Sequence, residues 1–168
     1  MNMRGVEQER DGDLTTISIT IDSELPADRV LAGATDFTAR RSKIFDAVQP
    51  KYFVVHEIGD GYADATEGTR WGGIVNWERC RYDWTQGHVT ATVMDSNVYA
   101  FPGSKWELSA TPSGGASLVE ITWTRRFNHR PKGRLFGFAL QRIGKSAFGK
   151  YASQIVEAIE NLEVATYH

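Results

Sequence analysis

The sequence has little cysteine, no long hydrophobic run and no large excess of charge of one sign. Its single cysteine, Cys80, excludes an internal disulfide framework, and isolated cysteines are mostly small buried residues. No run of about 18 apolar residues occurs, which excludes a membrane-spanning helix. The formal net charge of −2 argues against a dedicated nucleic-acid-binding protein, because such proteins usually have a strongly basic face.

The N-terminal segment lacks the features of a secretory signal. Residues 1–13 are polar and acidic, with no apolar stretch behind a basic one. Together with the single cysteine, this predicts a cytoplasmic protein. The same composition predicts a disordered tail over residues 1–13. Residues 14–168 are then expected to form one domain, because the chain is too short for two domains of ordinary size.

Short motifs of catalytic chemistry are also missing. The sequence contains no Gly-x-Ser-x-Gly elbow, no glycine-rich phosphate-binding loop and no dinucleotide fingerprint. The four histidines are scattered, and none has a second metal ligand at a usable spacing. We therefore expect neither a metal site nor a cofactor.

Aromatic residues, in contrast, are abundant, with five Trp, eight Phe and six Tyr in 168 residues. A domain of this size has a core of limited volume. So many large rings should therefore either fill the core or line a cavity.

The first structured segment reads as a strand followed by two short helices. Polar and apolar residues alternate strictly over residues 15–22, which is typical of a strand with one buried face. Pro26 indicates the start of a helix. Thr38 can cap a second short helix, and Arg41 is expected among the basic residues on the outer face of that helix.

Six further strands are expected before residue 128, which gives about seven in all. Turn signals such as Asp60-Gly61 and Gln86-Gly87 separate them. Because the connections are short, neighbouring strands should pair antiparallel. The expected strands span residues 52–59, 62–67, 71–84, 88–99, 104–111 and 117–127.

The last expected element is a long helix over residues 132–163, which contain no proline. Apolar residues recur along it at every fourth position and form a wide stripe. The concave face of the sheet is the only large surface on which this stripe can be buried. Since a curved sheet and one helix do not close tightly on each other, we expect a tapered apolar cavity between them.

This order of elements resembles the START/Bet v 1-like (SRPBCC) superfamily, in particular its bacterial polyketide cyclase/dehydrase and lipid-transport-like branch. Residues 25–30, 35–37 and 67–71 carry the resemblance together with the amphipathic helix after Phe127, and it covers about residues 15–163. It implies an α+β helix-grip fold. It also implies hydrophobic ligand binding, lipid transfer or, in some members, cyclisation or dehydration of polyketides. It assigns no catalytic residue.

Arg125 is a candidate for contact with a ligand. It follows Val119, Ile121 and Trp123 on the same face of the last strand, so it points towards the mouth of the expected cavity. There it can pair with a carboxylate, phosphate or enolate on an otherwise apolar molecule. The alternative is an arginine whose guanidinium reaches solvent at the strand end.

Glu78, Tyr82 and His56 are further candidate polar residues of the cavity. Glu78 and Tyr82 fall on one face of their strand if Arg79 and Arg81 form ion pairs on the solvent side. A carboxyl in a dry pocket has a raised pKa and can act as an acid or a base. A bulge near Gly72-Gly73 would invert this assignment. His56 is either a general base or a hydrogen-bonded core residue.

The expected cavity is lined mainly by rings, each of which could also be ordinary core. Its predicted residues are Trp71, Trp77, Tyr82, Trp106, Trp123, Arg125, Phe136 and Leu140.

Three functions remain open. The first is binding or transport of a small hydrophobic molecule, such as a lipid or polyketide, without catalysis. The second is a polyketide aromatase, cyclase or dehydratase that uses polar residues of the same cavity. The third is a protein-interaction module whose cavity has collapsed. A basic stretch over residues 125–134 either touches an anionic membrane or forms a solvated loop.

Overall fold

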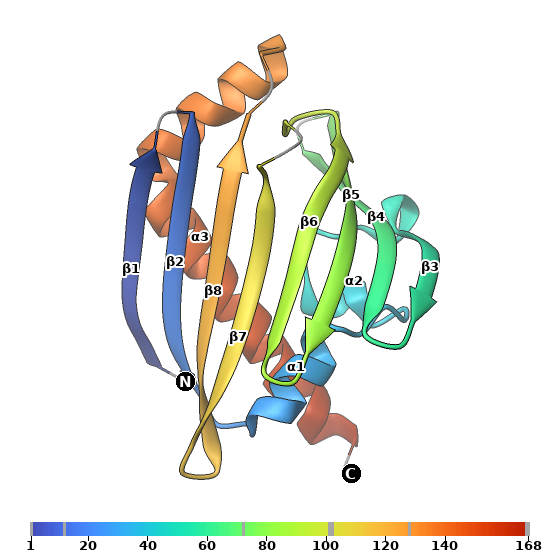
Figure 1. Ribbon diagram of the computed structural model, residues 1–168, viewed down its shortest axis with the longest axis vertical. Coiled ribbons are helices and arrows are strands. Elements are labelled where there is room, and N and C mark those ends of the chain that lie inside the picture. Colours follow the sequence, from blue (N-terminus) through green and yellow to red (C-terminus); the bar gives the residue numbers. More distant parts are fainter. Residues whose placement is uncertain (1, 12, 72, 101–102, 128, 167–168) are drawn as a thin grey trace.

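The computed structural model describes residues 2–11, 13–71, 73–100, 103–127 and 129–166. Within these ranges it describes the side chains except those of residues 71, 132, 136, 139–141, 143 and 163–166. A curved antiparallel sheet wraps around one long C-terminal helix, and two short α-helices pack against that helix (Figure 1). This is the predicted α+β helix-grip architecture.

In chain order the elements are β1 (Asn2–Asp11), β2 (Leu14–Ser23), α1 (Ala27–Ala34), α2 (Arg41–Ile44), the 3₁₀ helix η1 (Pro50–Tyr52), β3 (Val54–Gly59), β4 (Tyr62–Trp71), β5 (Ile74–Thr85), β6 (His88–Ser96), β7 (Lys105–Ser113), β8 (Ala116–Arg126) and α3 (Pro131–Thr166). The strand order in the sheet is β1-β2-β8-β7-β6-β5-β4-β3, and all neighbours are antiparallel. The pairing of β2 with β8 brings together strands that are about 100 residues apart in the sequence.

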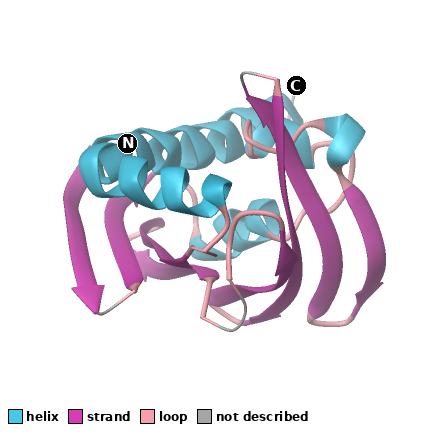
Figure 2. Ribbon diagram, turned by 90° about the horizontal axis from the view of Figure 1, so that it is seen from above, coloured by secondary structure: helices cyan, strands magenta, loops and turns pink. Residues whose placement is uncertain are grey.

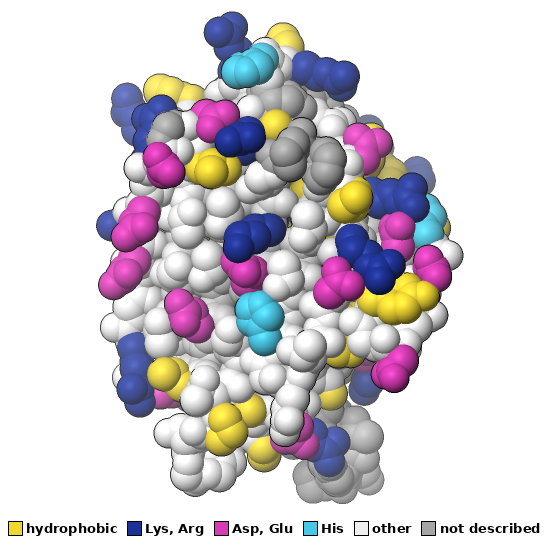
Figure 3. Space-filling model, in the orientation of Figure 1, with side chains coloured by type: hydrophobic (Ala, Val, Ile, Leu, Met, Phe, Trp, Pro, Cys, Tyr) yellow, Lys and Arg dark blue, Asp and Glu magenta, His cyan; other side chains and the backbone are white. Residues whose placement is uncertain are grey.

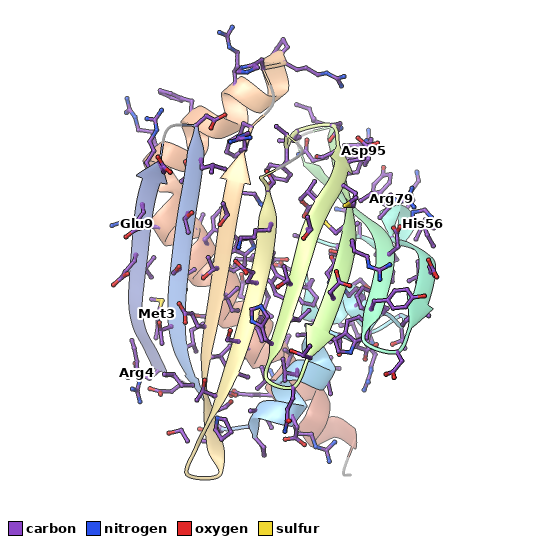
Figure 4. The ribbon with its side chains drawn as sticks, viewed as in Figure 1. Met3, Arg4, Glu9, His56, Arg79 and Asp95 are labelled. Atoms are coloured by element: carbon purple, nitrogen blue, oxygen red, sulfur yellow. The ribbon has the colours of Figure 1, made fainter. Side chains whose placement is uncertain are left out.

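The segment expected to be a disordered tail instead forms β1, which makes the described sheet eight-stranded rather than seven-stranded. Val6 lies opposite Ile19 of β2 and packs against the core, and Arg4 forms an ion pair with Asp22 at 2.7 Å. Figure 4 shows Met3, Arg4 and Glu9 along this edge of the sheet. The prediction was wrong because backbone pairing with the open edge of β2 needs few apolar side chains.

The β4–β5 hairpin also departs from the predicted strand boundaries. β4 continues to Trp71, and β5 begins at Ile74. Gly73 has a φ of +84°, a left-handed conformation that glycine adopts without steric cost. The predicted turns at Asp60-Gly61 and Gln86-Gly87 are present, and both glycines have positive φ.

The core lies between the concave face of the sheet and the C-terminal half of α3. Ile155 and Ile159 of α3 are 0% and 2% exposed, and β2 supplies three buried isoleucines from the opposite side. A Cβ atom at Gly33 of α1 would lie 2.6 Å from Cγ2 of Ile159. The absence of a side chain at Gly33 therefore lets α1 lie directly on α3.

The two faces of the sheet differ in what covers them. Seen from above, the helices lie on the concave side of the sheet (Figure 2). The opposite face is open, and its hydrophobic side chains are scattered among charged and other polar groups (Figure 3). Polar residues that alternate with buried ones, such as Ser18 and Thr122, form hydrogen bonds across the strands on the open face. The site must therefore be sought on the concave side.

Candidate functional site

A cavity of about 350 Å³ lies between the concave face of the sheet and the middle of α3. It falls at the small end of the range that is usual for ligand pockets. Strands β4–β8 form one wall, the segment from α2 to Val48 forms a second, and Ala147, Phe148 and Tyr151 of α3 form a third. The hypothesis of a protein-interaction module requires a collapsed cavity, whereas the cavity in the structure is open.

Rings form much of the apolar wall. The ring of Trp123 meets Phe148 edge-on, with centroids 5.0 Å apart, and Trp106 meets Phe45 in the same way at 5.8 Å. Because Trp106 and Trp123 are opposite each other on β7 and β8, their side chains lie on one face of the sheet. These contacts hold the rings in place around the empty space.

One buried ion pair in the wall has its hydrogen bonds completed. Arg41 is 1% exposed; its Nε donates to Glu67 Oε1 at 2.7 Å, and its Nη1 donates to the carbonyl oxygen of Ala34 at 2.7 Å. The guanidinium also lies over the ring of Phe45, 3.9 Å from the centroid. Since Ala34 is the last residue of α1, Arg41 ties the end of that helix to β4.

The position of Arg41 corrects the prediction that placed it on the outer face of the second short helix. α2 has only four residues, so it is too short to have a fixed outer stripe. Pairing with Glu67 and stacking on Phe45 turn the guanidinium inward, where it lines the cavity.

The second ion pair of the wall, Glu78–Arg125, is loose, and its carboxylate is only partly buried. Arg125 Nη2 lies 3.5 Å from Glu78 Oε1, while Nη1 donates to the carbonyl oxygen of Lys105 at 3.2 Å. Among the described residues, neither Glu78 Oε2 nor Arg125 Nε has a hydrogen-bond partner, and both are buried. Asn76 Oδ1 is a third buried atom without one. All three side chains line the cavity, so their free hydrogen-bonding capacity is available to a ligand.

The two carboxylates of these pairs are neighbours. Glu67 on β4 lies directly opposite Glu78 on β5, and both line the cavity. Arg41, Glu67, Glu78 and Arg125 thus form a row of four charged side chains across an otherwise apolar wall. Burial raises the pKa of Glu78, the nearby charge of Arg125 opposes this, and the charge of Glu67 adds to it.

Burial also keeps the tyrosine hydroxyls and the thiol of the wall neutral. It raises the pKa of the Tyr82 hydroxyl well above its usual value, with Glu67 adding to the effect, and it raises the pKa of Tyr99 and Tyr151. The pKa of the Cys80 thiol is likewise raised well above its ordinary value by burial. Cys80 therefore remains a thiol, which is a poor nucleophile.

Most of the candidate residues from the sequence meet at this cavity. It is lined by Trp77, Glu78, Tyr82, Trp106, Trp123 and Arg125. His56 does not join them. It is exposed on the open face, where its Nε2 lies 2.8 Å from the hydroxyl oxygen of Thr66 (Figure 4). The side chains of Trp71, Phe136 and Leu140 lie outside the described part of the structure.

Sequence reasoning missed Arg41, Glu67, Asn76 and Tyr99 as cavity residues. Glu67 carries a detectable signal, because it ends the alternation of small buried residues begun by Ala63 and Ala65. Tyr99 lies after the regular part of β6, and Arg41 lies in a helix of one turn. Local periodicity gives no orientation for either residue.

The described residues contain no group of three or more His, Cys, Asp or Glu side chains placed to hold a metal ion. No helix searched in the described part of the chain combines the length and hydropathy needed to cross a bilayer.

Comparison with known proteins gives a likeness in structure only. No protein-family model matches the sequence, and no curated protein sequence matches it. The fold is similar to TTHA0849 from Thermus thermophilus, with a TM-score of 0.70, 12% identity, and 88% of this chain and 98% of that chain covered.

Two further solved structures carry descriptive names. The Zhui aromatase/cyclase from Streptomyces sp. R1128 has a TM-score of 0.70 and 14% identity, with 89% of this chain and 96% of that chain covered. A START superfamily protein from Mycobacterium smegmatis has a TM-score of 0.69 and 11% identity, with 88% and 98% covered. At such identities the likeness concerns the fold and not the activity. The chain therefore shares the helix-grip fold of these solved structures.

Proposed function

We propose that this protein binds a compact, largely apolar molecule in the cavity between the sheet and α3. The observation that carries the proposal is the cavity of about 350 Å³, which has an aromatic wall interrupted by buried polar atoms that have no partner in the described part of the chain. Unfilled hydrogen-bonding groups in a core are costly unless a ligand or water satisfies them. The volume favours a molecule of a few fused rings or a short acyl chain over a lipid with two long chains.

The buried polar atoms of the cavity wall indicate which chemical groups the ligand would carry at its polar end. Arg125 Nε can donate to a carbonyl or carboxylate oxygen, and Glu78 Oε2 can accept from a hydroxyl group when ionised. A ligand whose hydroxyl stands next to its carbonyl matches both. Because Arg41 and Glu67 already bond to each other, they act as fixed wall rather than as contacts for the ligand.

Extraction of the native protein with organic solvent, followed by mass spectrometry, tests the proposal directly. A complementary test uses naphthalene-sized probes that differ only in their polar end: a hydrocarbon, a ketone and a hydroxy ketone. We expect affinity to rise in that order by about fivefold per hydrogen bond, since a net hydrogen bond contributes about 1 kcal/mol. Empty extracts, together with no binding of any probe, would contradict the proposal.

A matched pair of variants assigns the binding to this cavity. Ala147 lines the cavity but is exposed, so Ala147→Trp should fold and obstruct the site. Its neighbour Ser146 is exposed and does not line the cavity, so Ser146→Trp is the control. Binding that survives Ala147→Trp at full strength would place the ligand elsewhere.

The loose Glu78–Arg125 pair supports a second candidate function, aromatase, cyclase or dehydratase chemistry. Ionised Glu78 would take the proton from the carbon next to a ketone, and Arg125 would stabilise the enolate oxygen. The protonated carboxyl would then give that proton to a β-hydroxyl group, which leaves as water. The raised pKa of Glu78 suits both steps.

Turnover of a poly-β-ketone surrogate tests this second function. Glu78→Gln should abolish turnover while a bound probe is retained, because the amide is similar in size but cannot exchange a proton. If wild-type protein binds the surrogate and releases it unchanged, the protein is a carrier and the catalytic function is wrong.

A further inference from the structure

Charge is distributed very unevenly along this nearly neutral chain. Between Glu120 and Glu157 the sequence has five Arg, three Lys and no Asp or Glu. The whole chain has 19 basic and 21 acidic residues, so the remainder has 11 basic and 21 acidic residues. The positive charge is therefore concentrated in the end of β8 and the first half of α3. Figure 3 shows several Lys and Arg side chains around the end of the molecule where α3 begins.

Two large apolar side chains are exposed among these cations. Leu135 is 62% exposed and Phe138 is 58% exposed, the former being the most exposed large hydrophobic residue described. Arg134, Arg142 and Lys145 are exposed as well. At 100° per residue these five positions fall within an arc of about 100° on one side of α3. We call this set the basic–apolar face.

The glycines in the first half of α3 lie on the side of the helix that packs against the rest of the protein, away from the basic–apolar face. Gly133 and Gly144 are buried, and a Cβ atom at Gly137 would lie 3.3 Å from the ring of Phe127. The first half of α3 thus packs closely through its glycine side. The basic–apolar face points elsewhere, and this end of α3 extends beyond the ends of the strands (Figure 1).

We propose that the basic–apolar face docks the protein on an anionic membrane surface. Leu135 and Phe138 would enter the boundary between headgroups and acyl chains, and Arg134, Arg142 and Lys145 would contact lipid phosphates. The guanidinium of Arg142 lies 5.0 Å from the centroid of the Phe138 ring. A cation and an apolar ring of this face are therefore already in contact.

The mixture of side chains favours a bilayer over a polyanion such as a nucleic acid. A phosphate backbone is bound by cations, and an exposed Leu side chain beside them gains no apolar contact from it. An anionic bilayer offers both a negative surface and an apolar layer a few ångströms below it. The proposal is independent of the cavity ligand. It would, however, bring the helix that lines the cavity at Ala147 and Phe148 to the source of apolar molecules.

Sedimentation of the full-length protein with vesicles tests the proposal. Vesicles of equal parts phosphatidylcholine and phosphatidylglycerol are compared with vesicles of phosphatidylcholine alone. We expect binding to the anionic vesicles that weakens as salt is raised, and little binding to the neutral ones. Neutralisation of three cations (Arg134→Gln, Arg142→Gln and Lys145→Gln) should lower vesicle affinity about a hundredfold, at about fivefold per charge.

A second variant separates insertion from charge attraction. Leu135→Ser with Phe138→Ser should lower vesicle affinity at least about tenfold, because each side chain loses its burial in the acyl boundary. The matched control for the apolar pair is Val54→Ser with Ile58→Ser, two exposed residues of β3. For the charges it is Lys51→Gln with Arg70→Gln, both exposed and far from α3 in sequence.

Circular dichroism checks that each variant is folded, which is expected because every altered side chain is exposed. Absence of binding to anionic vesicles at low salt would overturn the proposal. Equal loss of binding in the control variants would overturn it as well. Tight binding to heparin that does not depend on Leu135 and Phe138, without vesicle binding, would instead identify a polyanion site.

Discussion

The two Arg–Glu pairs of the cavity wall lie side by side, yet they differ in how fully they are bonded and in how deeply their carboxylates are buried: the side chain of Glu67 is 10% exposed and that of Glu78 is 22% exposed. Arg41 and Glu67 meet at 2.7 Å, and Arg41 also bonds to the end of α1. Glu78 and Arg125 are 3.5 Å apart, and each has an atom without a partner among the described residues. A buried charge whose bonds are complete holds the fold together, whereas one with spare bonds is available to a ligand.

The largest expected effect is on the complete pair. Arg41→Met would leave Glu67 buried with an uncompensated charge and would free the carbonyl oxygen of Ala34. Loss of one partner of a buried pair costs about 3–5 kcal/mol. We therefore expect the free energy of unfolding, measured with denaturant, to fall by that amount. A loss below about 1 kcal/mol would mean that this pair is not structural.

The same substitution at the loose pair should cost less. Arg125→Met leaves Glu78, whose pKa is already raised by burial and which can take up a proton instead of remaining charged. We expect the free energy of unfolding to fall by less than about 2 kcal/mol, while affinity for a ketone probe falls about tenfold. Equal destabilisation by Arg41→Met and Arg125→Met would remove the distinction between the two pairs.

The pH dependence of stability sharpens the comparison further. Because the pKa of Glu78 is higher in the folded protein than in the unfolded chain, the folded state binds more protons between the two values. The contribution of Glu78 to stability is complete below its unfolded pKa, near 4, and is lost as the pH rises through its folded pKa. Glu78→Gln should therefore gain stability relative to wild type as pH rises from about 4 to 7. A constant difference in thermal midpoint across this range would contradict the raised pKa.

The smallest effect is expected for an ion pair on the open face. Arg79 contacts both carboxylate oxygens of Asp64, at 2.8 and 2.7 Å, and the side chain of Arg79 is 46% exposed. Exposed pairs contribute little, because water and salt screen them. Arg79→Ala should leave both the unfolding midpoint and probe affinity unchanged within error. A large loss of probe affinity would show that the outer face communicates with the cavity.

Much of the fold could be predicted because its signals are local. The alternation over residues 15–22, the Asp60-Gly61 turn and the apolar stripe after residue 132 specify a strand, a hairpin and a long helix. The stripe is buried towards its C-terminal end, at Ile155 and Ile159, whereas Leu135 at its start is 62% exposed. β1 could not be predicted, because its residues are mostly polar and exposed, and its place is set by the free edge of β2. Such pairing between strands depends on tertiary context.

The site was partly predictable for the same reason. Alternation along β5 and β8 places Glu78, Tyr82 and Arg125 on the concave face, and they do line the cavity. Arg41 is turned inward by Glu67, 26 positions later in the chain, and no local pattern indicates a partner at that distance. The distinction between complete and incomplete bonding is also invisible in a sequence, because it depends on whether two side chains lie 2.7 Å or 3.5 Å apart.

The close contact of Gly33 with Ile159 anchors the C-terminal half of α3. The C-terminal half is pressed against α1 and the buried strands, so it cannot shift without displacing α1. The N-terminal half has its apolar residues Leu135 and Phe138 in solvent. A side chain at position 33, even one as small as that of Ala, would press on Ile159 and force α1 away from α3.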